Sequence, residues 1–333
     1  MHALDHTDTA VGRGERVVRA VARGLRAYIR HFPAQPGKWL LYRVVNRMTR
    51  RFEVDLPAAT HFGASLPCRL YEVIQARIYL FGVWEPNLTH FLETRLDEGD
   101  AFLDVGANVG YFSLLASKRV GASGLVVAVE ASPSTFVKLE ENLLRNGASN
   151  VRALNVAAAR APGRVRLHAG PRANTGRSTT VEWSRLPVEA EVPAVPLVEL
   201  IEADQLRRCR IVKIDVEGGE LPLLENILDH LECFREDVEF VVEAAPDEIR
   251  RSGGCLREVV ARFRRAGFAA YRIENDYELG SYLGRLEPRA PRALEAIPAE
   301  QVDLVFSRID APELLSQRTP VSGRSCRRSL APR

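Results

Sequence analysis

Hydrophobic and polar positions follow two different patterns along this chain. From residue 99 onward, short continuous apolar runs alternate with stretches in which apolar residues recur every three or four positions. Continuous runs are typical of buried parallel strands, and the longer spacing is typical of helices packed on one face. Strands are predicted at Ala101–Val105, Gly124–Val129, Val151–Ala157, Ile211–Ile214, Val238–Glu243, Ala269–Ile273 and Val302–Ser307, and helices at Tyr111–Arg119, Ser134–Asn146, Glu220–Leu231 and Cys255–Ala266. The alternation predicts an α/β fold with helices on both faces of a mostly parallel sheet.

The N-terminal part has a different pattern. From Arg16 to Phe32, arginines fall between apolar residues at helical spacing, which predicts a basic amphipathic helix. Further helices are expected at Trp39–Arg51 and near Leu88–Leu96. We expect the first helix to pack on its own protein, and peripheral contact with a membrane surface or a partner stays open.

These patterns divide the chain into four segments. We expect a basic helical extension at 1–51, a mixed α/β lead-in at 52–98, the α/β domain at 99–310 and a disordered basic tail at 311–333. Residues 1–51 hold eleven basic and three acidic residues, and 316–333 hold five arginines and no acid. The remainder therefore carries −10 of an overall +3, which disfavours nucleic acid as a partner of the body.

Composition narrows the class of protein. Of the 333 residues, 46% are hydrophobic and 27% charged, as in soluble globular proteins. No continuous apolar stretch is long enough for a membrane-spanning helix, and the N-terminus lacks the apolar segment of a secretory signal. The five cysteines are scattered without a CxxC pair. We therefore expect neither a disulfide framework nor a zinc site, and a cytoplasmic location.

The segment after the first predicted strand, Asp104-Val-Gly-Ala-Asn-Val-Gly-Tyr-Phe112, carries candidate chemistry. A dinucleotide fingerprint needs glycines where this chain has Asn108 and Tyr111, so a nicotinamide oxidoreductase is disfavoured. A nucleoside that carries an amino-acid tail fits better. Gly106 lets the backbone pass close to such a ligand, Asp104 accepts from its ammonium group, and Glu130, at the end of the next strand, accepts its ribose hydroxyls.

Several motifs in order resemble the FkbM family of S-adenosylmethionine-dependent methyltransferases. They are Gly82-Val-Trp-Glu-Pro86, the segment 104–112, Glu130-Ala-Ser-Pro133 and Ile211-Val-Lys-Ile-Asp-Val-Glu-Gly218. One departure is Pro196-Leu-Val-Glu-Leu200, where the family often has Thr-Leu-Asp. The resemblance implies a Rossmann-like class I sheet of seven strands with the last one antiparallel. It also implies the cofactor S-adenosyl-L-methionine, bound by Glu85, Asp104, Gly106, Ala107, Asn108, Gly110, Tyr111, Glu130, Ser132, Ala157 and Asp215.

The same resemblance implies O-methylation of a small-molecule hydroxyl, on a sugar or natural product. Methyl transfer needs a group that takes the hydroxyl proton, and Asp215, Glu217 and Glu243 are the candidate catalytic residues. Asp215 and Glu243 could instead hold a divalent cation, but we expect no metal. His168 and the segment Asn174-Thr-Gly-Arg-Ser178 could border the acceptor. Two alternatives stay open: a scaffold that binds S-adenosylmethionine without turnover, and a methyltransferase acting on a macromolecule.

Overall fold

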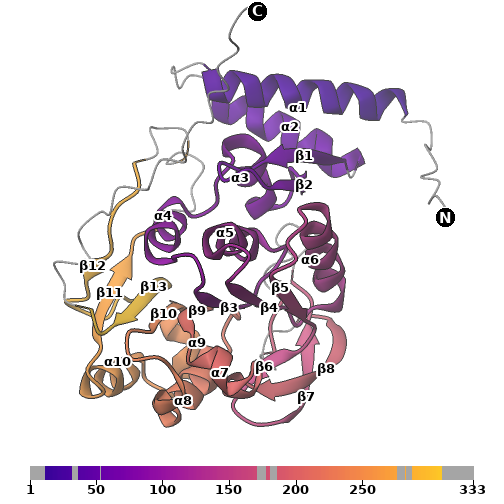
Figure 1. The fold of residues 1–333 in the computed structure, drawn as a ribbon. Coiled ribbons are helices and arrows are strands. Elements are labelled where there is room, and N and C mark those ends of the chain that lie inside the picture. The colour runs from indigo at the N-terminus through magenta and orange to yellow at the C-terminus, as the bar shows by residue number, and fades with distance from the viewer. Residues whose placement is uncertain are drawn as a thin grey trace, which may run out of the picture.

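The computed structural model describes residues 12–31, 37–52, 54–170, 178–180, 186–275, 282 and 287–309. Its centre is a sheet of eight strands in the order β12-β11-β13-β10-β9-β3-β4-β5 (Figure 1). The strands are β3 (Ala101–Val105), β4 (Leu125–Val129), β5 (Val151–Leu154), β9 (Cys209–Ile214), β10 (Glu239–Ala244), β11 (Ala269–Ile273), β12 (Arg292–Ala293) and β13 (Val302–Ser307).

Seven of these strands form the class I methyltransferase arrangement that the resemblance implies. The neighbours from β10 to β5 are parallel, and β13 lies antiparallel between β10 and β11, so the prediction of a reversed last strand is confirmed. The two-residue β12 adds an eighth strand at the edge. From β3 the chain continues to β4 and then β5, which lie to one side of β3 in the sheet. From β9 it continues to β10, which lies to the other side. The switch between β3 and β9 is where open α/β sheets bind ligands.

One predicted strand was wrong. The apolar run Val151–Ala157 is not a single strand, because β5 ends at Leu154 and the chain then enters β6 (Ala157–Ala159). That strand belongs to a separate three-stranded sheet with β8 (Val188–Pro196) and β7 (Gly163–His168). Asn155 lies between the two strands, and its side-chain amide donates to the carbonyls of Glu130 and Ala131. This polar residue breaks the run and redirects the chain over the carboxyl end of β4.

Helices cover both faces of the large sheet (Figure 1). One core lies under α3 (Val73–Phe81), α4 (Pro86–Arg95), α5 (Tyr111–Val120) and α6 (Pro133–Arg145). The other lies under α8 (Glu220–Asp229), α9 (Pro246–Arg251) and α10 (Leu256–Arg265), with the short α7 (Ala203–Leu206) beside them. Adjacent residues of β3 divide between the two cores: Phe102 joins the first, and Leu103 the second. Continuous apolar strands are therefore required here, as the sequence pattern predicted.

The N-terminal helices pack on the domain. The helix α1 (Arg13–His31) buries Val18, Ala22, Leu25 and Ile29, and α2 (Lys38–Phe52) follows it. The hairpin of β1 (Asp55–Ala59) and β2 (Ser65–Arg69) lies beneath them, and the Arg30 guanidinium donates to the carbonyl oxygen of Leu80 in α3 at 2.9 Å. The expectation that the first helix packs on its own protein is confirmed, and the predicted tail 311–333 lies outside the described residues.

Two further expectations concern membranes and disulfides. Within the described part of the chain, no helix combines the length and the apolar character that crossing a membrane requires. The four cysteines in that part, Cys68, Cys209, Cys233 and Cys255, are unpaired.

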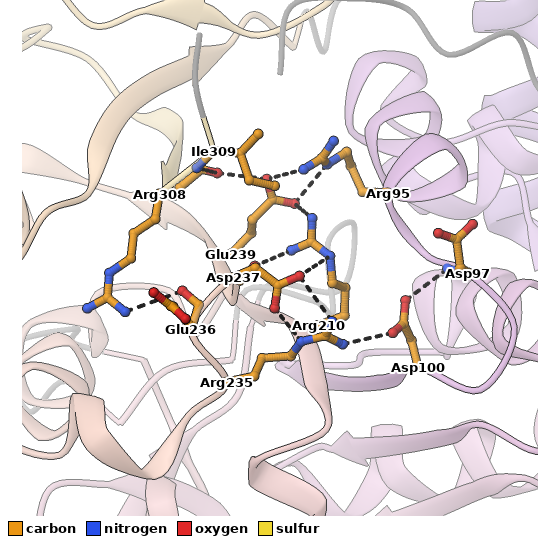
Figure 2. A network of polar contacts seen from close by, with 11 residues as sticks. Arg95, Asp97, Asp100, Arg210, Arg235, Glu236, Asp237, Glu239, Arg308 and Ile309 are labelled. Atoms are coloured by element: carbon orange, nitrogen blue, oxygen red, sulfur yellow. Dashed lines mark hydrogen bonds and ion pairs between the residues drawn. The ribbon is translucent and has the colours of Figure 1, made fainter. Parts of the chain in front are cut away.

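A buried ion-pair network holds the amino ends of the strands together (Figure 2). The Glu239 carboxylate, at the start of β10, is fully buried and accepts from Arg95 at 2.9 and 3.0 Å, from Arg210 at 3.0 Å and from Ser307 at 2.9 Å. These partners come from the end of α4, from β9 and from the end of β13. The network thus joins three strands and a helix at the edge of the sheet opposite to the ligand edge.

We predict that Glu239→Gln lowers the free energy of unfolding by about 3 kcal/mol, because two largely buried guanidiniums lose their counter-charge. Urea denaturation monitored by circular dichroism measures the change. The matched control is Arg164→Gln, which removes a pair whose side chains are 60% and 55% exposed and should cost below about 1 kcal/mol. Equal losses of unfolding free energy in the two variants would show that the buried network stabilises the fold no more than an exposed ion pair does.

Candidate active site

A cavity of about 290 Å³ lies at the carboxyl ends of β3, β4 and β9, on the predicted ligand edge of the sheet. Its walls come from several elements. The residues lining it are Val73, Ile74, Trp84, Glu85, Val105, Gly106, Asn108, Val129, Glu130, Ala131, Val156, Ala157, Ala158, Leu167, Ser178, Thr180, Asp215, Val216, Glu217, Gly219, Glu243 and Gln301. All three predicted catalytic residues are in this set, with six of the eleven predicted cofactor residues.

The backbone at Gly106 touches the neighbouring strand. Gly106 has a φ of +82°, and a Cβ added there would lie 1.7 Å from the carbonyl oxygen of Asp215. The sequence argument expected Gly106 to leave room for a ligand. The structure gives an additional and stricter reason, because β3 and β9 could not approach each other at this point with any side chain between them.

Glu130 holds the loop that follows β3. Its two carboxylate oxygens accept from the backbone N–H of Asn108 at 2.9 Å and of Ser132 at 2.8 Å. Asn108 has a φ of +51°, the left-handed conformation that asparagine tolerates best after glycine. Burial raises the pKa of Glu130 to about 7, although both backbone N–H groups oppose this shift. Each oxygen keeps further acceptor capacity toward the cavity, as a pair of vicinal hydroxyls would require.

A buried lysine lies directly behind the cavity. Lys213 extends from β9 toward α5, with its Nζ 3.2 Å from Asp215, 3.6 Å from Asp104 and 5.2 Å from the centre of the Phe112 ring. Burial opposes its charge, but the two carboxylates outweigh burial and raise the pKa of Lys213. Sequence analysis gave this residue no role, although a lysine inside an otherwise apolar strand was a visible signal.

Three carboxyl groups in the cavity lining lie close together. Asp215 follows β9, Glu243 lies in the neighbouring β10, and Glu217 lies in the loop after β9; their nearest oxygens lie within 4.8 Å of one another. Glu217 has a φ of +53°, and its carbonyl oxygen accepts from the Thr179 hydroxyl at 2.7 Å. Oxygen ligands so arranged could hold a divalent cation.

The protonation of the cluster follows from its neighbours. Burial alone would raise the pKa of Asp215, but the Lys213 ammonium and a hydrogen bond with Glu243 lower it. Burial and the charge on Asp215 raise the pKa of Glu243 well above its usual range. Asp215 is therefore the more acidic member of the pair, and Glu243 is the member that binds a proton first as the pH falls. The Lys213 ammonium, 3.2 Å from Asp215, compensates the charge of that carboxylate.

Five predicted cofactor residues support the site without lining the cavity. Asp104 is fully buried, accepts from the Ser113 hydroxyl at 2.6 Å and faces Lys213, so its side chain does not line the cavity. Ser132 caps α6 by accepting from the Thr135 N–H. Ala107 and Gly110 form the turn into α5, and Tyr111 packs in the core against Phe62.

Other residues complete the opening. Glu85, with a φ of +43° and a nearly buried side chain, follows Trp84 at the start of α4, and both line the cavity. The predicted border residue Ser178 lines it as well, whereas His168 bonds to the carbonyl oxygen of Leu186 and does not. Asn174 and Gly176 lie outside the described residues. Sequence reasoning missed Thr180 and Gln301, which belong to no motif.

Comparisons with known proteins identify the family of this fold. The model of the methyltransferase FkbM domain matches residues 104–268, about half of the chain. The hexuronic acid methyltransferase AglP of Haloferax volcanii is 28% identical over 159 residues, covering 47% of this chain and 61% of that protein. Methyltransferase 1 of Beauveria bassiana is 26% identical over 149 residues, covering 39% and 59%. The chain thus spans about three fifths of the length of these relatives.

A solved structure shows a more distant likeness. A SAM-dependent O-methyltransferase from Thermotoga maritima is 14% identical, with a TM-score of 0.38 over 78% of this chain and 80% of that one. The class of the fold rests on the strand order described above.

We predict that Gly106→Ala lowers the free energy of unfolding by about 3 kcal/mol or more, because the added methyl group overlaps the Asp215 carbonyl. Gly63→Ala is the matched control: Gly63 has nearly the same φ, +84°, with open space around it, so only the conformational cost of about 1–2 kcal/mol applies. Chemical denaturation of both variants tests this. A Gly106 variant as stable as the Gly63 variant would contradict the close approach of β3 and β9.

Proposed function

Because residues 104–268 make this chain a member of the FkbM methyltransferase family, we propose that it transfers a methyl group from S-adenosylmethionine to a hydroxyl group of a small molecule, a sugar above all. The observation that carries this proposal is the pairing of two different carboxylate sites across one cavity. Glu130 offers acceptors for a ribose on one wall, and Asp215 with Glu243 offers a place for a proton on the other.

The residues present fit the methyl donor. When bound, S-adenosylmethionine supplies an electrophilic methyl group on a sulfonium centre. Glu130 would accept the two ribose hydroxyls, while the N–H groups of Asn108 and Ser132 keep its carboxylate in place. The small side chain of Ala157 and the backbone at Gly106 leave space along the cavity floor. Glu85, which lines the cavity, would accept from the amino-acid tail, rather than the fully buried Asp104.

The acceptor side carries the proton chemistry. As the hydroxyl oxygen forms its bond to the methyl group, its O–H bond breaks and the proton needs an acceptor. Asp215 is charged, partly exposed to the cavity and hydrogen-bonded with Glu243, so it is the carboxylate that takes this proton. Lys213 keeps Asp215 ionised and fixed at 3.2 Å. A positioned base of this kind contributes roughly 10²–10⁴-fold to the rate.

The charge of the lining points to the class of acceptor. Glu85, Glu130, Asp215, Glu217 and Glu243 line the cavity, and its described lining residues include no lysine or arginine. These carboxylates would repel an acceptor that itself carries a negative charge, such as a sugar carboxylate. Although the relative from Haloferax volcanii is named for hexuronic acid, we expect a sugar without a carboxylate to be the better acceptor here.

Binding of the cofactor product S-adenosylhomocysteine should depend on pH through Glu130. The pKa of Glu130 is about 7, and only the ionised form offers all its acceptors, so affinity should fall by up to tenfold per pH unit below about pH 7 and level off above it. Glu130→Gln should weaken binding by ~1.5–3 kcal/mol and remove this slope. Calorimetry between pH 5.5 and 8.5, about 1.5 units either side of the pKa, measures both effects. Unchanged affinity in the variant would refute the ribose assignment.

Asp215→Asn should lower kcat by roughly 10²–10⁴-fold with a smaller effect on cofactor affinity, because the amide cannot take the proton. Mass spectrometry after incubation with neutral glycosides and with matched glycuronides measures the gain of one methyl group and identifies the acceptor. Binding of S-adenosylmethionine without any methylated product would favour the non-catalytic scaffold.

Two controls accompany this variant. Glu217→Gln and Glu243→Gln show whether another carboxylate is the base: large losses there, with Asp215→Asn active, would contradict our assignment. EDTA should leave the wild-type rate unchanged, because the Lys213 ammonium already compensates the charge on Asp215. Loss of activity in EDTA, restored by Mg²⁺, would make the three carboxyl groups metal ligands instead.

A further inference from the structure

The outward side of the α1–α2 helix pair gathers exposed apolar side chains. Among the described residues, eight large hydrophobic side chains are strongly exposed, and five of them lie on these two helices: Val17, Trp39, Leu40, Val44 and Phe52. The exposed fractions of Trp39 and Leu40 are 54% and 62%. In Figure 1 the two helices form the outermost layer of the molecule, on the far side of α3 from the sheet.

The same helices hold a concentrated positive charge. Residues 12–52 contain eleven lysines and arginines and one acid, Glu15, whereas the rest of the domain is acidic. On α2 the arginines Arg43, Arg47 and Arg51 are exposed, and they follow Leu40 and Val44 at helical spacings of three or seven residues. The Arg43 guanidinium lies 4.6 Å from the centre of the Trp39 ring. Cationic and apolar groups are thus interleaved on one surface.

Three kinds of partner could meet such a surface. A nucleic acid would use the arginines but would leave Leu40 and Val44 without an apolar contact. A second copy would bring two strongly basic surfaces together, and their charges would repel. An anionic bilayer uses both features, since its headgroups attract arginines while leucine, valine and tryptophan side chains enter the boundary between headgroups and acyl chains.

We propose that the outward side of α1–α2 binds the surface of an anionic membrane, with the helices lying in the plane of the interface. The inner faces of both helices are occupied by the domain: α1 buries Val18, Ala22, Leu25 and Ile29, and α2 buries Val45 and Thr49. Binding therefore leaves the fold unchanged. The helix α3 contacts α1 and also contributes Val73 and Ile74 to the cavity, so one helix links the membrane face to the active site.

Co-sedimentation of the full chain with lipid vesicles tests the proposal. The protein should sediment with vesicles of phosphatidylcholine and phosphatidylglycerol, and far less with phosphatidylcholine alone. Arg47→Gln/Arg51→Gln should lower the partition coefficient roughly 20-fold, because each basic residue near an anionic surface contributes about a factor of five. Leu40→Ser/Val44→Ser should lower it by at least about tenfold at unchanged charge.

Matched controls separate this surface from general effects. Arg257→Gln/Arg265→Gln on α10 removes the same charge, and Val137→Ser/Leu144→Ser on α6 removes apolar groups that are at least as exposed. Both variants should bind vesicles as the wild type does. Sedimentation that survives both α2 variants, or no sedimentation with anionic vesicles, would overturn the proposal. So would tight binding of an RNA or DNA oligomer that is lost in the arginine variant and kept in the apolar variant.

Discussion

A buried cation between two strands determines the arrangement of the site. Lys213 lies between Asp104 of β3 and Asp215 after β9, at the point where Gly106 lets the two strands approach. The lysine lies nearer to Asp215, which therefore stays ionised, whereas burial outweighs the same cation for Asp104 and raises the pKa of that group. One ammonium thus fixes the position and the charge of the carboxylate that faces the cavity. Without it, three carboxyl groups could not remain so close together.

Much of this arrangement could be predicted from the sequence, because the spacing of apolar residues and the residues at strand ends are local properties of the chain. The apolar runs defined the large sheet, and the position of Glu130 after the second strand placed it beside the loop that it holds. What failed depended on contacts between distant segments. Asp104 occupies the strand end where an acid contacts ligand in the predicted site, yet the pleat turns its side chain toward α5 and Lys213. The predicted strand Val151–Ala157 is interrupted at Asn155, because the side-chain amide of Asn155 donates to the carbonyl oxygens of Glu130 and Ala131, directly after β4.

Residues outside motifs also shape the cavity, and no periodicity reveals them. Thr180 and Gln301 are more than a hundred residues apart in sequence and meet at the cavity only through the folded sheet. The Thr179 hydroxyl donates to the backbone carbonyl of Glu217, which is in the left-handed conformation, from a segment that bridges to His168 of β7. Such roles arise from tertiary contacts, which the amino-acid pattern of either segment alone does not encode.

The two edges of the large sheet use the same residue types for opposite purposes. At the amino edge, Glu239 is buried with two guanidiniums and a hydroxyl as partners, and this complete compensation makes it a fixed point of the fold. At the carboxyl edge, Asp215 faces Lys213 at 3.2 Å and lines a cavity together with Glu217 and Glu243. A carboxylate that faces a cavity can accept a further proton or donor group from a ligand. Glu239 and Asp215 therefore differ in their surroundings: protein donors enclose the first, and the second opens onto a cavity.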